Sequence, residues 1–288
     1  MTTKPEILLD CQFEHPEGLV WDARGERLLW VDIFKGNLLS YELTQRSLET
    51  LELGQRVGCV APRSNGGLVC GVHKGFGLVS EHGQFSPVNP QLFDAPYLQM
   101  NDGGVDARGR FWAGSMTLEH EMRPGVGTLY RLDPDGSVSS QLGGISISNG
   151  IGWSPDSKWC YYVDSATRRI DRYAYDLGEG RLSDRHTLAE VEALPDGLAV
   201  DVDGCIWVAM FEGWEVSRFT PSGQIDRTIR LPGSQVTTCA FGGRDLRTLF
   251  ISVSPYGMSK KDLQAQKAGY IFAVDPGVEG LPTYPFAG

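Results

Sequence analysis

One motif recurs six times along the 288 residues, and its period constrains the fold more than any other feature of the sequence. Each copy has a polar or small first residue, a short apolar run, a turn and a second apolar run, and the second and last copies are the weaker ones. The copies begin 41, 43, 48, 47 and 41 residues apart, at Glu17, Gly58, Asn101, Asn149, Asp196 and Thr237. Units of roughly 40–50 residues with three to four strands each are typical of β-propeller blades.

Further strands are predicted within these units wherever apolar and polar residues alternate ahead of a turn. Such runs cover residues 37–42, 128–132, 169–175 and 215–219. The sequence therefore predicts an all-β fold, a six-bladed β-propeller with a central channel, as a single domain over residues 1–288. An open β-sandwich is the alternative, but it does not explain the sixfold period. To close the ring, we expect residues 7–9 to pair with the last blade at residues 270–274.

Composition excludes several classes of protein. The net charge is −10, from 26 basic and 36 acidic residues, and no block of five basic residues occurs, so we expect no nucleic-acid partner. No window approaches the roughly 18 apolar residues of a membrane span, and the N-terminus lacks the apolar stretch of a signal peptide. The six cysteines include no CxxC pair, which favours reduced thiols. We expect a cytoplasmic protein, a monomer or weak homo-oligomer, that binds no membrane.

The first residues of the six motif copies are candidates for a functional site. In a propeller, the innermost strands line the channel, so equivalent positions of the blades form a ring. Here that ring contains two carboxylates and two carboxamides, which are hard oxygen ligands suited to Ca²⁺ or another divalent cation. Asp, Asn and Gly also begin turns for purely local reasons, so the pattern alone leaves both interpretations open. The five histidines lack the spacing of a zinc site, and no GxSxG motif marks a nucleophile.

At these motifs the chain resembles the family of SMP-30, gluconolactonase and regucalcin-like sugar lactonases, and the likeness extends over nearly all 288 residues. The motifs that support the resemblance are Glu17-Gly18 before residues 28–32, Asn101-Asp102-Gly103 before residues 110–116, Ser148-Asn149-Gly150 before residues 153–156, and Pro195-Asp196-Gly197 followed by residues 198–201. The resemblance implies a six-bladed propeller with one divalent metal ion in its channel.

The resemblance also assigns roles to individual residues. It implies that the metal ligands are Glu17, Asn149 and Asp196, that Asn101 contacts substrate, and that Asp102 lies beside the metal. A loop carboxylate that contacts the sugar corresponds to Glu119 or, as a second candidate, to Glu121. Relatives often carry an Arg two residues before the Asn of the Asn-Asp-Gly motif, whereas this chain has Gln99. An amide can still bind sugar hydroxyls, so Gln99 is a candidate substrate residue, while the identity of the sugar stays open.

The activity implied is hydrolysis of a sugar (aldono-) lactone to the sugar acid. The metal would act as a Lewis acid on the lactone carbonyl, and Asp196 would act as general base as well as ligand. Ca²⁺ is the expected ion, with Zn²⁺, Mn²⁺ and Fe²⁺ as alternatives. Two other functions remain open: a calcium-binding or scaffold propeller without catalysis, and a related propeller phosphotriesterase or aryl-ester lactonase.

Overall fold

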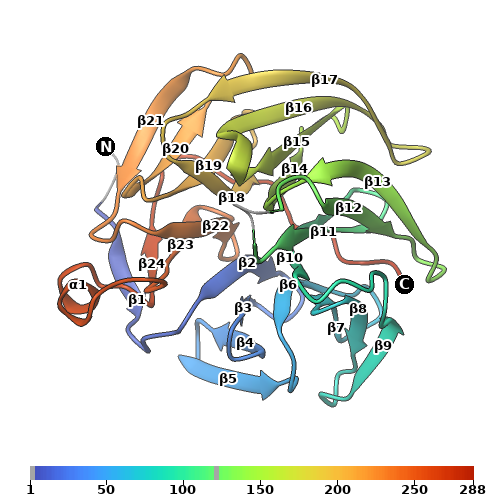
Figure 1. The fold of residues 1–288 in the computed structure, drawn as a ribbon. Helices are drawn as coiled ribbons and strands as arrows, with labels where there is room; N and C mark the ends of the chain where they lie inside the picture. The colour runs from blue at the N-terminus through green and yellow to red at the C-terminus, as the bar shows by residue number, and fades with distance from the viewer. Residues whose placement is uncertain (1–3, 120–122) are drawn as a thin grey trace.

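Six antiparallel sheets of four strands stand around a central axis in the computed structural model, which describes residues 4–119 and 123–288 (Figure 1). The first strand of each repeat unit lies at the axis, and the following strands pair outward in order of sequence. Each repeat unit thus forms one blade. The predicted all-β, six-bladed propeller is confirmed.

The strands of the first five blades follow one another from the axis outward. Blade 1 contains β2 (Pro16–Asp22), β3 (Arg27–Asp32), β4 (Asn37–Glu42) and β5 (Ser47–Glu52). Blade 2 contains β6 (Val57–Pro62), β7 (Leu68–Val72), β8 (Gly75–Val79) and β9 (Phe85–Asn89). Blade 3 contains β10 (Leu98–Val105), β11 (Phe111–Thr117), β12 (Gly127–Leu132) and β13 (Val138–Ile145).

Blade 4 contains β14 (Ser148–Trp153), β15 (Trp159–Asp164), β16 (Arg169–Asp176) and β17 (Arg181–Glu190). Blade 5 contains β18 (Leu194–Val200), β19 (Ile206–Phe211), β20 (Glu215–Phe219) and β21 (Ile225–Arg230). The four alternating runs that the sequence predicts as strands coincide with β4, β12, β16 and β20 to within one residue at either end.

Blade 6 joins the two ends of the chain and closes the ring. Its strands are β22 (Val236–Gly242), β23 (Thr248–Val253), β24 (Tyr270–Val274) and the N-terminal β1 (Glu6–Leu9). Strand β1 pairs antiparallel with β24, with Ile7 opposite Phe272, as the sequence predicts. Without this pairing β24 would be an unpaired outer edge next to blade 1.

Every innermost strand contains a register shift at the first residue of its motif. The shifts lie between Glu17 and Val20, Val57 and Cys59, Met100 and Gly103, Ser148 and Ile151, Pro195 and Leu198, and Val236 and Cys239. A β-bulge removes residues from the hydrogen-bond ladder and redirects their side chains. The sixfold repeat in the sequence is therefore a sixfold repeat of this bulge, which faces the channel.

In two of the blades, an aspartate five positions after the motif's first residue accepts hydrogen bonds from buried side chains. In blade 3, Asp106 accepts hydrogen bonds from Arg110 Nε (2.7 Å) and Trp112 Nε1 (2.8 Å). It also accepts one from the hydroxyl of Tyr175 in blade 4, at 2.6 Å. In blade 5, Asp201 holds a Trp and an Arg in the same way. The Asp in the repeat thus has a structural role, separate from the channel residues.

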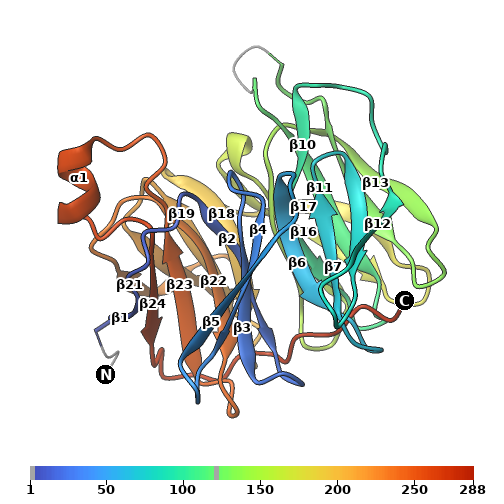
Figure 2. The same ribbon diagram turned by 90° about the horizontal axis from the view of Figure 1, so that it is seen from below.

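Two segments lie on opposite faces of the propeller (Figure 2). The short helix α1 (Lys260–Ala265), between β23 and β24, stands at the outer rim of one face, beside blade 6. The C-terminal residues 275–288 cross the opposite face, where Leu281 N donates to Val200 O (3.1 Å) and Phe286 N donates to Pro62 O (2.8 Å). The one other helical segment in the described residues is a 3-10 turn, η1 (Ser165–Thr167). Within residues 4–119 and 123–288, no helix is long and apolar enough to cross a membrane.

Candidate active site

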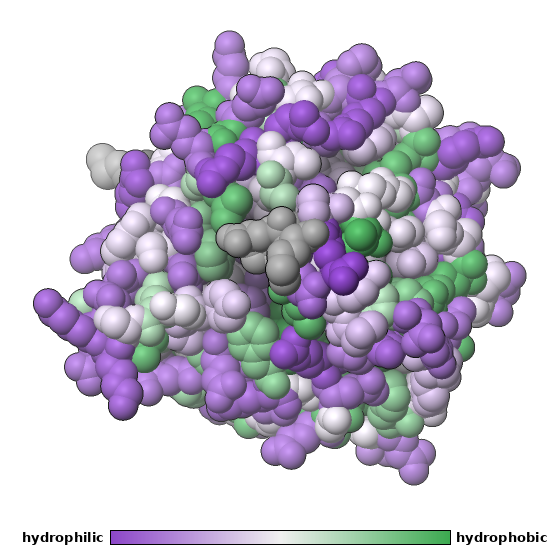
Figure 3. Space-filling model, viewed as in Figure 1, coloured by the Kyte–Doolittle hydropathy of each residue, from purple (hydrophilic) through white to green (hydrophobic). Residues whose placement is uncertain are grey.

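The polar residues at the motif positions come together at the axis although they are far apart in sequence. Glu17 lies on β2, Asn101 and Asp102 on β10, Asn149 on β14 and Asp196 on β18, and all five side chains are buried. Because each lies in or directly beside the bulge near the start of an innermost strand, the group lies toward the face of the propeller on which α1 stands. The face seen in Figure 3 is mainly hydrophilic, with hydrophobic residues scattered over it.

Aspartates at the ends of two second strands fix the segments that lead into the ring. Asp32, the last residue of β3, accepts hydrogen bonds from the backbone N–H groups of Glu14 (2.8 Å) and His15 (3.0 Å), just before Glu17. In blade 4, Asp164 accepts equivalent bonds from the two residues that precede Ser148 and Asn149. Two carboxylates outside the ring therefore hold the backbone that presents the ring side chains.

Glycines after the ring residues allow neighbouring blades to approach closely. A Cβ on Gly150 would lie 2.7 Å from both the carbonyl oxygen of Asp196 and the backbone nitrogen of Leu198. A Cβ on Gly197 would lie 2.5 Å from Thr238 Oγ1. Larger residues at these positions would push blades 4, 5 and 6 apart. The glycines thus bring the donors of different blades within reach of one another.

A chain of side-chain hydrogen bonds connects three blades around the ring. Asn101 Nδ2 donates to Asn149 Oδ1 (3.0 Å) and to the carbonyl oxygen of Ser148 (2.8 Å). Asn149 Nδ2 donates to Ser165 Oγ (2.7 Å), and the Ser165 hydroxyl donates to the carbonyl oxygen of Pro195 (2.6 Å). Both amides are therefore held in one orientation, and the last acceptor is adjacent to Asp196.

Three carboxyl groups at the axis destabilise one another's charged forms. Burial and the charges of Glu17 and Asp102 raise the pKa of Asp196 well above its usual range, although Gly197 N–H opposes this. Burial and the charge of Asp102 likewise raise the pKa of Glu17, and burial raises the pKa of Asp102 to about 6. No Lys or Arg contributes to any of these shifts. Among the described residues, the site thus brings three carboxyl groups together without a basic side chain to compensate their charge.

This set of donors fits a hard divalent cation. Asp196 Oδ1 is buried and has no hydrogen-bond partner within the described part of the chain. Within that part, no three His, Cys, Asp or Glu side chains form a group that could hold a metal, so an amide oxygen such as that of Asn149 has to complete the set. Carboxylate and amide oxygens are the ligands that Ca²⁺ prefers, and water completes its shell.

The other residues predicted to contact substrate lie around the opening of the channel next to the ring. Gln99 is buried on β10, and its Oε1 accepts a hydrogen bond from Arg56 Nη1 at 2.8 Å. Glu119 lies on the loop after β11, where its carboxylate pairs with Arg123 Nε at 2.7 Å, so it is not part of the buried group. Glu121, the second candidate for this role, falls outside the described residues.

Three residues near the ring are not singled out by the sequence. Ser165 orients the Asn149 amide, and Arg56 contacts Gln99. His15 is half-buried, with Nδ1 2.6 Å from Ser254 Oγ and its ring stacked on Phe34. Burial lowers the pKa of His15 to about 4, so it is neutral at pH 7. The pairing of His15 with Ser254 spans 239 residues and exists only because the ring closes.

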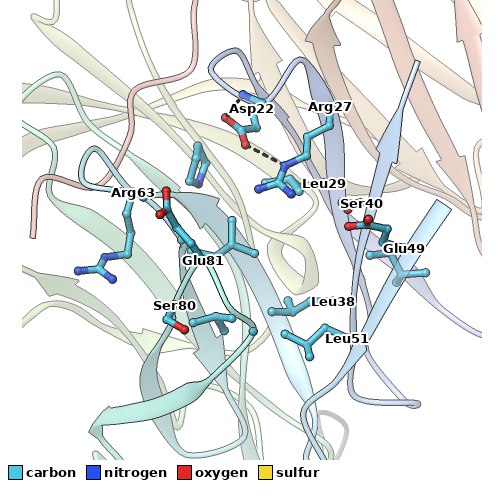
Figure 4. A pocket seen from close by; sticks show the side chains of 18 of the residues that line it. Asp22, Arg27, Leu29, Leu38, Ser40, Glu49, Leu51, Arg63, Ser80 and Glu81 are labelled. Atoms are coloured by element: carbon cyan, nitrogen blue, oxygen red, sulfur yellow. Dashed lines mark hydrogen bonds and ion pairs between the residues drawn. The ribbon is translucent and has the colours of Figure 1, made fainter. Parts of the chain in front are cut away.

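A cavity lies elsewhere, between the outer parts of blades 1 and 2 (Figure 4). Its volume is about 750 Å³, and its walls combine aliphatic side chains such as Leu38 and Leu51 with the Asp22–Arg27 ion pair. A second cavity of about 170 Å³ lies in the channel between Asp102 and residues 281–284 of the C-terminal segment. The ring carboxyls Glu17 and Asp196 line neither cavity. Size alone therefore does not locate the candidate site.

Comparison with known proteins agrees with the geometry of the channel. The family model described as the SMP-30/Gluconolactonase/LRE-like region matches residues 15–254, which include all six motif copies. The chain belongs to this family. The resemblance inferred from the motifs is thereby confirmed.

Two similar curated family members have different names. Regucalcin from Danio rerio is 35% identical over 293 residues, with 99% of each chain covered. The 6-deoxy-6-sulfogluconolactonase from Pseudomonas putida is 36% identical over 293 residues, covering 99% of this chain and 97% of its own. A solved structure of a calcium-binding protein, regucalcin, from Agrobacterium tumefaciens superimposes with a TM-score of 0.94 at 23% identity, covering 100% of this chain and 98% of that one. At that identity the last comparison establishes the fold.

Proposed function

We propose that this protein hydrolyses a sugar lactone with one divalent cation, most simply Ca²⁺, held by Glu17, Asn149 and Asp196. The observation that supports this most directly is the buried Asp196 Oδ1, which has no partner in the described residues and lies in a group of three carboxyls. A relative named 6-deoxy-6-sulfogluconolactonase, similar along almost its whole length, supports a lactone as substrate.

A bound divalent cation would polarise the ester carbonyl as a Lewis acid. Asp196 would accept the proton of the water that attacks the lactone carbonyl carbon. As the bond between that carbon and the ring oxygen breaks, Asp196 would return the proton to the ring oxygen, which leaves as a hydroxyl group. General acid–base catalysis of this kind typically contributes 10²–10⁴-fold.

The remaining residues position the sugar. Asn101, held by the backbone and the amide of blade 4, presents its amide at the mouth of the ring. Gln99 and Glu119 lie further out and would contact sugar hydroxyls, while Asp102 contributes negative charge beside the cation. These contacts would fix the lactone carbonyl near Asp196, which is the main requirement for a reaction between a bound ester and water.

The experiment is a proton-release assay on glucono-, xylono-, galactono- and arabinono-lactones. We expect acceleration that a chelator abolishes and that Ca²⁺, Zn²⁺, Mn²⁺ or Fe²⁺ restores to different extents. Asp196→Asn should lower kcat by about 10²–10⁴-fold with the fold intact. Asp184→Asn, the same change on the exposed outer strand β17, is the matched control. Turnover without metal, or an active Asp196→Asn variant, would contradict the proposal.

A second function, calcium binding without catalysis, is favoured by the name of the solved structure from Agrobacterium tumefaciens. The same donors would serve it, so binding alone does not separate the two functions. Calorimetric binding of Ca²⁺ together with no turnover of any of the four lactones would support the second function.

A further inference from the structure

Blade 2 is the one blade whose ring position has no side chain. A Cβ on Gly58 would lie 2.4 Å from the carbonyl oxygens of both Met100 and Asn101, so only glycine fits between blades 2 and 3. Arg56 lies two residues earlier, and its carbonyl oxygen accepts a hydrogen bond from His73 N at 2.9 Å. Arg56 directly precedes β6, and its side chain reaches Gln99 on β10 of blade 3. Arg56 is thus the side chain that blade 2 contributes beside the candidate substrate residues.

The Arg56 guanidinium is fixed in place beside the candidate substrate residues. Its Nη1 donates to Gln99 Oε1 at 2.8 Å, and its Cζ lies 5.5 Å from the centre of the Phe34 ring. Gln99 is 2% exposed and precedes Asn101 by two residues on β10. Because two residues of a strand span roughly 7 Å, a substrate that contacts both Asn101 and Gln99 would also lie beside Arg56.

The charge of Arg56 is not neutralised by a neighbouring carboxylate. Buried arginines elsewhere, Arg110 and Arg218, each form an ion pair with an aspartate at 2.7–2.8 Å. In the described part of the chain, Arg56 forms no ion pair, and its side-chain partner is the neutral Gln99 amide. Lys74 also lies nearby, where it pairs with Asp94 at 3.9 Å. Burial together with the charges of Lys74 and Arg56 lowers the pKa of His73.

We propose that Arg56 binds an anionic group on the substrate, and hence that the substrate is an aldonolactone with a sulfonate, phosphate or carboxylate on its exocyclic carbon. This inference rests on the lactonase function proposed above. A guanidinium presents a planar fork of N–H donors that matches an oxyanion, and such charge-assisted bonds are about twice as strong as neutral ones. A neutral sugar would leave this half-buried charge without a counterion.

The test compares neutral gluconolactone with lactones that carry a 6-sulfonate, a 6-phosphate or a 6-carboxylate. We expect the best anionic lactone to have a kcat/KM at least tenfold above that of gluconolactone, through KM, and this preference to fall as NaCl is raised. Arg56→Gln should raise KM for the anionic lactone about 10–100-fold, and the ratio of kcat/KM for the anionic lactone to kcat/KM for gluconolactone should fall by a similar factor. Arg56→Lys should restore part of the preference. The order of kcat/KM among the three anionic lactones identifies the anionic group of the substrate.

Two controls separate this inference from the proposed function. Arg46→Gln removes the same charge from the exposed turn between β4 and β5 and should leave both substrates unaffected. Equal effects of Arg56→Gln on neutral and anionic lactones, with hydrolysis of both, would overturn the inference and leave the lactonase function standing. If no lactone is hydrolysed, calorimetry with 6-phosphogluconate and gluconate still tests the inference. Equal affinities for the two compounds overturn it. Tighter binding of 6-phosphogluconate, lost in the Arg56→Gln variant, supports it.

Discussion

Replacing Asp102 with Asn should stabilise the metal-free protein at neutral pH. The carboxyl is buried, and burial raises its pKa from the ordinary 3.8 to about 6. At 1.36 kcal/mol per pKa unit, this difference corresponds to roughly 3 kcal/mol of unfavourable free energy when the group is ionised in the folded state. Asparagine has nearly the same shape, and its Oδ1 can still accept the bond from Gly103 N (2.7 Å).

The pH dependence follows from the direction of the shift. Between about pH 4 and pH 6 the folded state binds more protons at Asp102 than the unfolded state, so the stability of the wild type falls as pH rises through this window. Below about pH 4 both states are protonated and the cost disappears. The asparagine side chain does not titrate, so the Asp102→Asn variant should gain up to about 3 kcal/mol at pH 7 and nothing below pH 4.

Chelator-treated wild type and Asp102→Asn are compared by urea unfolding and by thermal melting from pH 4 to pH 8. For a chain of this length, 3 kcal/mol corresponds to a rise in Tm of about 5 °C at pH 7. Added Ca²⁺ should reduce the difference, because a cation in the ring favours the ionised carboxylate. An equal Tm for both proteins at pH 7, or a difference that persists at pH 4, would refute the reasoning about the buried charge.

Three further outcomes are expected. Chelation should lower the Tm of the wild type, since a cation at 100 times its Kd adds about 2.7 kcal/mol to stability; an unchanged Tm would argue against a resident ion. Gly150→Ala should cost about 1–3 kcal/mol in urea unfolding and weaken Ca²⁺ binding measured by calorimetry, whereas Gly143→Ala, with nothing within 4 Å, should do neither. Asp106→Ala should cost about 3–5 kcal/mol because it leaves Arg110 buried without its counterion; a loss under about 1 kcal/mol in urea unfolding would show that this ion pair is unimportant.

The fold was predictable because the residue pattern that one blade requires occurs six times in the sequence. Glycine at Gly150 and Gly197 leaves room for the next blade, and the Asp five residues after Asn101 or Asp196 holds a buried Trp. Segments outside the repeat offer no second copy for comparison. Helix α1 and the C-terminal segment across the channel were therefore not predicted.

The candidate site was predictable only as far as the repeat reaches. Equivalent positions of the blades must lie close together around the channel, so the sequence alone could place Glu17 and Asp196 in one group. Contacts such as that of Arg56 with Gln99 join residues 43 positions apart, through side chains whose direction depends on neighbouring blades. Ser165 likewise acts on an amide 16 residues earlier, and nothing in its local sequence signals this.

The bulge in each innermost strand separates the residues that determine stability from those that determine chemistry. Because Asn149 and Asp196 stand outside the ladder, exchanging either side chain leaves strand pairing intact. Side chains at such positions can therefore vary one blade at a time without rebuilding the scaffold. The exception is Gly58, where the backbone of blade 3 fills the space and variation has to occur at a neighbouring position.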